Sequence, residues 1–252
     1  MSHDLKKFKF LKKIIGSIGY KLVDKKSVKT ERLIDNFSLK IENILQPLIN
    51  KKKVNKIIQV GANDGKSDDY LFKCFNKDLD AILIEPIEDA FLKLKENYKN
   101  FENVIFDNSA IISDEKISYL FKVNEKFLDK YGNHIPAISS FDKQHLINHG
   151  VKNSHIVKEK VNSLTIKDLI SKHSIRNLDL FFVDAEGYDG KIVYDLLTQS
   201  DLRPIIIFEY IHIQNNFFRK LINLFISKNF LYFSIGECII SFPKEKKIEI
   251  SF

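Results

Sequence analysis

The sequence contains only two cysteines in 252 residues and lacks long apolar runs. Cys74 and Cys238 lie far apart and form no Cys-x-x-Cys or Cys/His pattern, so we expect no structural zinc site and a reducing, cytoplasmic location. No apolar run reaches the roughly 18 residues that a membrane span needs. Lysines interrupt every apolar stretch before Ile14, and no small-residue cleavage site follows, so we also expect no signal peptide.

Arginine is scarce as well. Only four of the 40 basic residues are arginines, at positions 32, 176, 203 and 219. Arginine is the preferred residue for bidentate contacts with bases and phosphates, so its scarcity argues against a nucleic-acid partner. The net charge of +7 is also local, because residues 1–30 contain nine lysines and two aspartates, whereas the rest of the chain contains 31 basic and 31 acidic residues. The main body is therefore neutral.

The basic N-terminal segment has an amphipathic pattern. Within residues 5–22, apolar residues recur every three or four positions, and most of the lysines lie away from that stripe, which predicts a helix. Two interpretations stay open: peripheral contact with an anionic membrane surface at the inner membrane face, or a helix that caps the domain. A second helical pattern covers 31–49, and we place a basic, helical cap at residues 1–53.

From Val54 onward, short apolar runs alternate with helical patterns, which predicts a domain at 54–252. We expect an α/β fold with a Rossmann-like, mostly parallel sheet, an antiparallel C-terminal edge and an N-terminal helical cap. The expected strands are 56–60, 80–85, 103–106, 156–161, 178–184, 204–210, 231–235, 239–242 and 248–252. The expected helices are 67–75, 87–98, 165–172, 191–197 and 216–229. Segments 110–112 and 117–123 are expected to pair as a hairpin or edge pair, and Ser163 or Ser171 to lie near the ends of helix 165–172.

The first informative motif is the turn Val60–Ser67 between a buried strand and a helical pattern. It is not a phosphate-binding P-loop, because Gly61 and Gly65 enclose three residues and not four. It is not the dinucleotide fingerprint either, because position 63 is Asn. The next strand ends in Glu85, and a carboxylate there can accept hydrogen bonds from both hydroxyls of a ribose. This combination suits an adenosine-type ligand without a pyrophosphate site, such as S-adenosylmethionine.

The second informative motif places carboxylates at the ends of two later strands. Asp184 and Glu186 follow the buried strand 178–184, and Glu209 and His212 follow strand 204–210. If these strands are neighbours, the four side chains converge on one small volume. Such a cluster can hold Mg²⁺ or Mn²⁺, with Asp184, Glu209 and His212 as ligands, or can supply a general base. The residues leave both possibilities open.

Together these motifs resemble the FkbM family of S-adenosylmethionine-dependent methyltransferases. The resemblance covers about residues 54–210 and is specific in the order of its segments. The matching segments are Val60–Gly65, Ile84-Glu85-Pro86, Asp107-Asn108-Ser109-Ala110, Val161-Asn162-Ser163-Leu164, Asp184–Gly187 and Ile207-Phe208-Glu209. Gln59 stands where many members have Asp. Tyr188-Asp189 stands where a small residue and Glu are commoner.

The resemblance implies roles for individual residues. The turn Gly61–Gly65 would approach the methionine part of the cofactor, with Asn63 and Asp64 as polar contacts. The segment Glu85-Pro86 would hold the ribose through the carboxylate, and Asn108 with Ser109 would lie near the adenine. Asp184 would border the sulfonium and the acceptor.

We therefore predict an O-methyltransferase. The turn Asp184–Gly187 differs from the Asn/Asp-Pro-Pro-aromatic turn of many enzymes that methylate amino groups. By analogy, we favour a hydroxyl of a sugar or nucleotide-sugar used for capsule or lipopolysaccharide, and a secondary metabolite is the alternative acceptor. Asp184, Glu186 and His145 are the candidate catalytic residues, and 131–155, with His145 and His149 four residues apart, is the expected acceptor-side lid.

Two other classes of protein remain open. A nicotinamide-dependent oxidoreductase would share the glycine turn and Glu85, but it needs a pyrophosphate-binding glycine that this turn does not have. A non-catalytic membrane-surface protein with a retained nucleoside pocket would bind through residues 5–22. Its binding to liposomes would survive deletion of the pocket carboxylates.

Overall fold

The computed structural model of the chain describes residues 40–67, 69–113, 119–132, 135 and 138–246. These residues belong to a compact unit that begins at Lys40. The predicted helix at 5–22, the first part of the helical pattern at 31–49 and the predicted strand at 248–252 lie outside the described residues. The compact unit starts before the boundary expected after residue 53, because helix α3 (Ile41–Asn50) packs against the 3₁₀ turn η2 (Phe72–Cys74).

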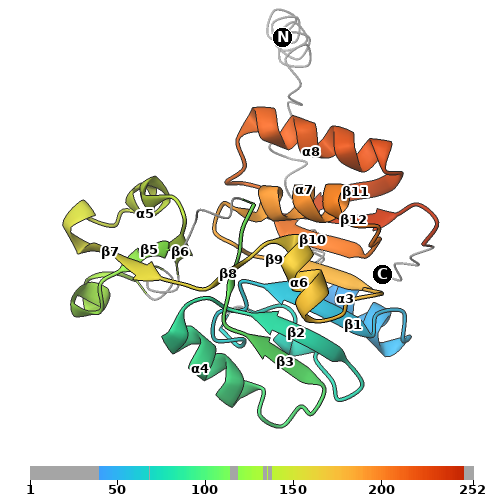
Figure 1. Cartoon of the computed structure of the whole chain (residues 1–252), viewed down its shortest axis with the longest axis horizontal. Helices are drawn as coiled ribbons and strands as arrows, with labels where there is room; N and C mark the ends of the chain where they lie inside the picture. Colours follow the sequence, from blue (N-terminus) through green and yellow to red (C-terminus); the bar gives the residue numbers. More distant parts are fainter. Residues whose placement is uncertain (1–39, 68, 114–118, 133–134, 136–137, 247–252) are drawn as a thin grey trace, which may run out of the picture. The chain divides into compact units, whose positions relative to one another are not determined.

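The centre of the unit is a seven-stranded sheet with the order β11-β12-β10-β9-β1-β2-β3 (Figure 1). Neighbouring strands from β10 to β3 run parallel, whereas β12 is antiparallel to both β10 and β11. The strand bounds are β1 (Lys56–Val60), β2 (Asp80–Ile84), β3 (Val104–Asp107), β9 (Leu180–Val183), β10 (Ile205–Glu209), β11 (Phe230–Ile235) and β12 (Cys238–Pro243). The fold is thus the expected Rossmann-like class, with a mostly parallel sheet and an antiparallel C-terminal edge.

The central strands form because their side chains are apolar on both faces. Every residue of β9 is buried, as are all residues of β1 except Lys56 and all of β10 except Glu209. Such strands need cover on both faces, which parallel crossover connections provide. From β1 the chain proceeds to β2 and β3 on one side, and β9 and β10 lie on the other. The order therefore reverses between β1 and β9, and the carboxyl ends of these two strands meet at a topological switch point, where open α/β sheets bind ligands.

The helices that flank the sheet are α4 (Glu88–Asn97), α6 (Ile166–Lys172), α7 (Asp189–Gln199) and α8 (Asn215–Ser227). Helix α5 (Lys143–Asn148) packs instead against the small strands β5 and β6. Helices α6, α7 and α8 share one buried cluster with β1, β9 and β10, which includes Phe181, Ile192 and Phe225. Helix α6 begins at Thr165, whose hydroxyl accepts a hydrogen bond from the Asp168 amide. Ser163 and Ser171 lie near the two ends of the helix, as expected, and Thr165 is the N-cap.

A lobe of smaller elements projects beside the sheet and comprises residues 119–160 (Figure 1). Its described elements include the antiparallel sheet β6-β5-β7, helix α5 and the 3₁₀ turns η3 and η5. Their bounds are β5 (Tyr119–Val123), η3 (Glu125–Lys130), β6 (Ser139–Ser140), η5 (Asn153–His155) and β7 (Ile156–Lys160). The lobe has its own small core, formed by Val123, Ile138, Leu146 and neighbouring residues.

Two predicted elements are wrong in the described part of the chain. The hairpin between 110–112 and 117–123 does not form, because β4 (Ala110–Ile111) pairs in parallel with β8 (Ser163–Leu164), while β5 pairs with β6 and β7. The helix predicted at 67–75 is only the single turn η2. Asp69 explains the difference, because its carboxylate accepts hydrogen bonds from the Leu71 and Phe72 amides and holds the segment in a turn.

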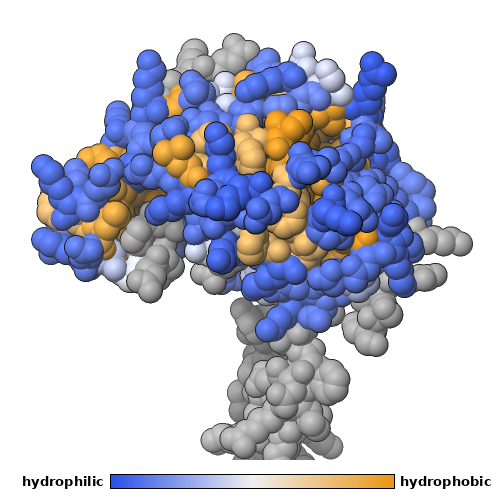
Figure 2. All heavy atoms as spheres, turned by 90° about the horizontal axis from the view of Figure 1, so that it is seen from below, coloured by the Kyte–Doolittle hydropathy of each residue, from blue (hydrophilic) through white to orange (hydrophobic). Residues whose placement is uncertain are grey.

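The surface is predominantly polar on the face shown in Figure 2, with apolar residues appearing between charged ones. The exposed large apolar side chains come from different elements and include Leu92 of α4, Ile105 of β3 and Ile226 of α8. Among the described residues, no helix is both long and apolar enough to cross a membrane.

Candidate active site

The turn after β1 lies directly against the turn after β9. Gly61 has a φ of +78°, and a β-carbon built there would lie 1.7 Å from the carbonyl oxygen of Asp184. Only glycine permits this approach of two backbones. The amides of Gly61 and Ala62 donate to the carbonyl oxygen of Ile84, so the same turn is also fixed to β2. The predicted glycine turn therefore joins three strand ends at the switch point.

Glu85 lies at the end of β2 and is 5% exposed. Its Oε2 accepts a hydrogen bond from the Asn63 amide at 2.9 Å, and its Oε1 accepts one from the Ile87 amide at 2.8 Å. Burial raises the pKa of this carboxyl to about 7, and the nearby Asp184 raises it further, while the two amides partly offset the rise. The two amide hydrogen bonds hold the carboxylate in one orientation. Each oxygen has a second lone pair, so the carboxylate can also accept hydrogen bonds from ligand hydroxyls.

Two other residues predicted to bind the cofactor, Asp64 and Gly65, contact neighbouring parts of the protein. Asp64 folds back on its own turn, where it accepts hydrogen bonds from the Lys66 and Ser67 amides and from the Ser67 hydroxyl. Gly65 packs against Leu94 and Tyr98 of the α4 region. Asp64 and Gly65 therefore shape the turn and do not line the cavity described below.

Asn108 and Ser109 follow β3 but face different surroundings. The Asn108 amide donates to the carbonyl oxygens of Glu85 and Pro86 at 3.0 and 3.3 Å, so it fixes the end of β2. Ser109 lines the cavity, and its hydroxyl donates to Asp107 at 2.7 Å. The sequence predicted their proximity to the site and did not distinguish these two roles.

Asp107 connects the end of strand β3 to helix α6 and was not singled out in the sequence. Its carboxylate lies 2.6 Å from His173 Nε2 and 2.9 Å from Lys172 Nζ, both at the end of α6. Hydrogen bonds from Lys172, His173 and Ser109 lower the pKa of Asp107 even though burial opposes them. An acidic residue at a strand end is the same signal that identified Glu85, and it could have flagged Asp107.

A buried pair of polar side chains lies beside the Gly61 turn. The Gln59 amide donates to Asp69 at 2.9 Å. Gln59 Oε1 is buried and has no hydrogen-bond partner among the described residues. Burial raises the pKa of Asp69. In the sequence, Gln59 stood out only as a departure from the family pattern. The structure shows that its Oε1 is available to accept a hydrogen bond from a ligand and that Asp69 lies next to it.

The turn after β9 presents Asp184 and Glu186. Asp189, at the start of α7, holds this turn by accepting hydrogen bonds from the Ala185 and Gly187 amides at 3.1 Å each. Loss of hydration, together with the neighbouring carboxylates of Glu186 and Asp69, raises the pKa of Asp184 to about 7. The predicted pair of carboxylates is thus present on a rigid turn.

The lobe is connected to this turn through Glu186. His145 of α5 places its Nε2 3.0 Å from Glu186 Oε2, and the Ser140 hydroxyl donates to the Glu186 carbonyl oxygen at 2.9 Å. The structure thus places His145, a predicted catalytic residue, next to Glu186, and its catalytic role stays a prediction. His145 lines the outer groove described below, whereas Asp184 lines the inner cavity and the cleft, and Glu186 lines all three.

Glu209 and His212 follow β10 on the same edge of the sheet. Glu209 Oε2 lies 3.7 Å from His212 Nε2. Burial and the charges of Asp184 and Glu186 raise the pKa of Glu209 to about 8, whereas burial and the neighbouring histidines lower that of His212. The predicted ligand set of Asp184, Glu209 and His212 does not form a group of three close donor atoms among the described residues. The group that does so is His145, His149 and His212.

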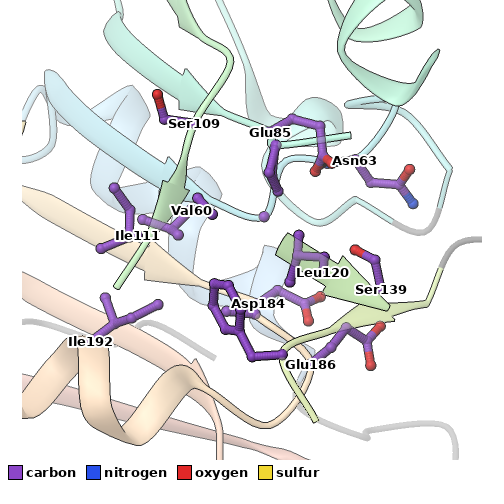
Figure 3. Close-up of a pocket in the computed structure, with 15 residues that line it drawn as sticks. Val60, Asn63, Glu85, Ser109, Ile111, Leu120, Ser139, Asp184, Glu186 and Ile192 are labelled. Atoms are coloured by element: carbon purple, nitrogen blue, oxygen red, sulfur yellow. Dashed lines mark hydrogen bonds between the residues drawn. The ribbon is translucent and has the colours of Figure 1, made fainter. Parts of the chain in front are cut away.

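Three hollows meet at these residues. The inner cavity, about 80 Å³, lies between the strand ends and the lobe, with Glu85 and Asn63 on one side and Asp184 and Glu186 on the other (Figure 3). Its apolar walls come from Val60, Ala110, Ile111, Leu120, Phe141 and Ile192. The cleft, about 450 Å³, shares Gly61, Asn63, Asp184 and Glu186 with the inner cavity and extends to Gln59, Glu209 and His212. The outer groove, about 640 Å³, is lined by His145, Glu186 and Lys191 among others.

The donor set matches S-adenosylmethionine. Apolar walls beside the Glu85 carboxylate suit a purine and a ribose. The unused Gln59 acceptor and Asp69, in the cleft next to Gly61, suit the ammonium end of an amino acid. Gly61 lines both hollows, with Glu85 in the inner cavity and Gln59 and Asp69 in the cleft, so the two ends of such a ligand have separate places beside one turn.

Comparisons with known proteins agree with this geometry. The profile of the methyltransferase FkbM domain matches residues 59–232. A comparison with curated protein sequences finds no match.

Solved structures show distant likeness. An O-methyltransferase from Bacillus cereus in complex with SAH has 11% identity and a TM-score of 0.43, with 92% of this chain and 96% of that chain covered. The O-methyltransferase TomG from Streptomyces achromogenes, in complex with SAM, has 10% identity and a TM-score of 0.45, with 92% and 95% covered. The ribosomal protein L11 methylase from Lactobacillus delbrueckii subsp. bulgaricus has 12% identity and a TM-score of 0.40, with 79% and 75% covered.

The family profile covers the segment that contains β1, Glu85, the turn after β9 and β10, which is where the site is built. The chain therefore belongs to the FkbM family of S-adenosylmethionine-dependent methyltransferases.

Proposed function

We propose that this protein transfers a methyl group from S-adenosylmethionine to a hydroxyl of a sugar or nucleotide-sugar. The observation that carries the choice of a hydroxyl is the position of Asp184, which opens into both the inner cavity and the cleft. A hydroxyl is a weak nucleophile when protonated, and a carboxylate with a pKa of about 7 is well matched to accept its proton near neutral pH.

The residues divide the work between binding and proton transfer. Glu85 and the Gly61 turn orient the cofactor, which supplies a methyl group on a positively charged sulfur. As the acceptor oxygen bonds to the methyl carbon, the carbon–sulfur bond breaks with its electron pair going to sulfur, and Asp184 takes the hydroxyl proton. Glu186 lies two residues from Asp184, and its carboxylate accepts a hydrogen bond from a second hydroxyl of the substrate that receives the methyl group. His145 is a positioning residue, since it fixes Glu186 at 3.0 Å.

The outer groove is the proposed acceptor side. It adjoins the cleft through Glu186 and His212 and has about 640 Å³, a volume within the range of small-molecule sites. Its lining mixes polar and aromatic residues, including Asp142, Lys191, Asn216 and Phe217. Hydroxyl-rich sugars suit such a surface, and Lys191 would attract a phosphate of a nucleotide-sugar. A secondary metabolite with one exposed hydroxyl is the alternative acceptor.

Cofactor binding is tested by titrating S-adenosylmethionine and S-adenosylhomocysteine into the full chain, with NAD for comparison. Micromolar binding of both sulfur ligands and none of NAD is expected. Glu85→Ala should weaken binding by at least about tenfold, since one buried charged hydrogen bond is worth roughly 1.5–3 kcal/mol. Glu88→Ala, an exposed glutamate three residues away, is the matched control and should bind like the wild type. No binding of either sulfur ligand would overturn the cofactor assignment.

The role of Asp184 gives a separate prediction. Asp184→Asn should lower the methyl-transfer rate by roughly 10²–10⁴-fold, because the proton acceptor is lost, while cofactor affinity changes little. The rate of the wild type should fall as the pH drops below about 7, where Asp184 becomes protonated, and this fall should be absent in the variant. Asp201→Asn, an exposed position, is the control. The assay measures transfer of labelled methyl groups to a panel of nucleotide-sugars, and an unchanged rate in Asp184→Asn would exclude its role as the base.

A further inference from the structure

Three histidines gather at the rim of the site. His145 belongs to α5, His149 is the residue that ends α5, and His212 follows β10. One potential ligand nitrogen from each lies within 4.8 Å of the other two. Their ring centroids are 4.6 Å apart for the 145–149 pair, 4.7 Å for 145–212 and 5.3 Å for 149–212. Among the described residues, no other group of three His, Cys, Asp or Glu side chains brings its potential ligand atoms this close to one another.

Carboxylates lie beside two of the rings. Glu186 Oε2 is 3.0 Å from Nε2 of His145, and Glu209 Oε2 is 3.7 Å from Nε2 of His212. Histidines that bind a metal through one ring nitrogen generally present the other nitrogen to a carboxylate or carbonyl oxygen, which fixes the tautomer and the ring orientation. Glu186 therefore occupies the place of such an outer partner for His145, and Glu209 lies near the ring of His212.

We propose that His145, His149 and His212 bind one divalent transition-metal ion of the Zn²⁺ or Co²⁺ type. Imidazole nitrogens suit such ions, whereas Mg²⁺ and Mn²⁺ prefer oxygen ligands. Three histidines leave a fourth position of a tetrahedral ion open. This proposal differs from the ligand set of Asp184, Glu209 and His212 in both its donors and its metal.

The open position would face the proposed acceptor side. His145 and His212 line the outer groove, while His149 and His212 line the cleft, and Glu186 borders both. An acceptor oxygen could bind the ion there and become more acidic. In a tetrahedral site the three nitrogens lie about 3.3 Å apart at metal–nitrogen distances of about 2.0–2.1 Å. The rings must therefore rotate slightly toward one another on binding.

The test is a titration of metal-free full-length protein with Co²⁺, followed by visible absorption, and competition by Zn²⁺. Tetrahedral Co²⁺ absorbs strongly in the visible range, so the spectrum reports the ligand geometry without any assay of activity. We expect one ion per chain. His149→Gln and His212→Gln should each weaken binding by roughly 100-fold or more, and Glu186→Gln by roughly 10–100-fold.

The variants are chosen so that folding can be separated from binding. His149 and His212 are only half-buried, whereas His145 is buried and is left unchanged. His155→Gln is the control, since His155 stacks on Phe127 away from the cluster. Thermal unfolding of metal-free His149→Gln and His212→Gln should match the wild type. Added Zn²⁺ should raise the unfolding temperature of the wild type and of His155→Gln, each relative to its own metal-free form, and should leave that of His149→Gln and His212→Gln unchanged.

Binding of Co²⁺ that is unchanged in both His149→Gln and His212→Gln, or no binding by the wild type, would overturn the proposal. Neither cofactor nor acceptor is present in the titration. A negative result would therefore leave the methyl-transfer proposal intact, and a failure of S-adenosylmethionine to bind would leave the metal site intact.

Discussion

At Gly61, the turn after β1 and the turn after β9 touch backbone to backbone. We predict that Gly61→Ala lowers the free energy of unfolding by at least about 3 kcal/mol, because the new β-carbon would overlap the Asp184 carbonyl oxygen and φ is +78°. Gly150→Ala is a matched control, with φ of +86° and no atom within 4 Å of the added carbon, and should cost only about 1 kcal/mol. Urea denaturation measures both. Equal losses would show that strain in φ alone explains the effect.

Glu85 gives a prediction about pH. The folded state raises the pKa of Glu85 and Asp184 to about 7 and that of Glu209 to about 8, above their values in the unfolded chain. The folded protein therefore holds more protons than the unfolded chain across this window, so its stability should fall as the pH rises from 5 to 8. Glu85→Gln should flatten this fall by roughly 2 kcal/mol. Urea denaturation at several pH values measures it, and an unchanged slope in the variant would contradict the assignment.

For single residues, the sequence predicted which positions lie at the candidate site better than it predicted which way their side chains point. Gly61, Glu85, Asp184 and Glu186 could be predicted because each follows a recognisable buried strand, and strand ends of a parallel sheet meet at one edge. It could not show that Asp64 turns back onto its own turn. Such choices depend on which backbone amides are unpaired nearby, and that depends on tertiary structure.

At the scale of elements, long apolar strands were predicted closely and short ones were not. The run at 204–210 contains β10 (Ile205–Glu209), because a continuous apolar segment is buried on both faces. The two-residue strands β4 and β8 are too short to show a pattern, and their pairing joins Ala110 to Ser163. The segment 117–123 was therefore assigned the wrong partner.

The start of α6 tests the capping observed in the structure. Thr165 accepts a hydrogen bond from the Asp168 amide, and the Asp168 carboxylate accepts one from the Thr165 amide. Thr165→Ala should therefore destabilise the protein by about 1 kcal/mol. Ser171→Ala, at an exposed position in the same helix, should change stability by less than about 0.5 kcal/mol. Denaturation curves measure both, and a larger loss in Ser171→Ala than in Thr165→Ala would contradict the role of Thr165 as the cap.

At the scale of the whole molecule, the inner cavity is too small for its proposed ligand. It holds about 80 Å³, whereas an engineered cavity that accepts benzene has about 150 Å³. Leu120, Ser139 and Phe141 of the lobe form its outer wall, so we predict that the lobe moves outward when the cofactor binds. Hydrogen exchange at 119–123 and 138–160 should change when S-adenosylhomocysteine is added, while β1 and β9 stay unchanged. No change in the lobe would contradict this motion.

The parallel pairing of β4 with β8 suggests which segment of the chain determines the choice of acceptor substrate. Ala110 pairs with Ser163 and Ile111 with Leu164 in a separate two-stranded sheet, so the segment between β4 and β8 begins and ends at adjacent points. The described residues between them, including His145, His149 and the wall formed by Leu120 and Phe141, belong to one chain segment whose two ends lie side by side. Such a cassette can be lengthened, shortened or exchanged between relatives without moving the strands that hold the cofactor. Chimeras cut at residues 112 and 162 would then inherit acceptor preference from the donor of the insert, and their cofactor affinity would show how much Leu120 and Phe141 of the insert contribute to the inner cavity.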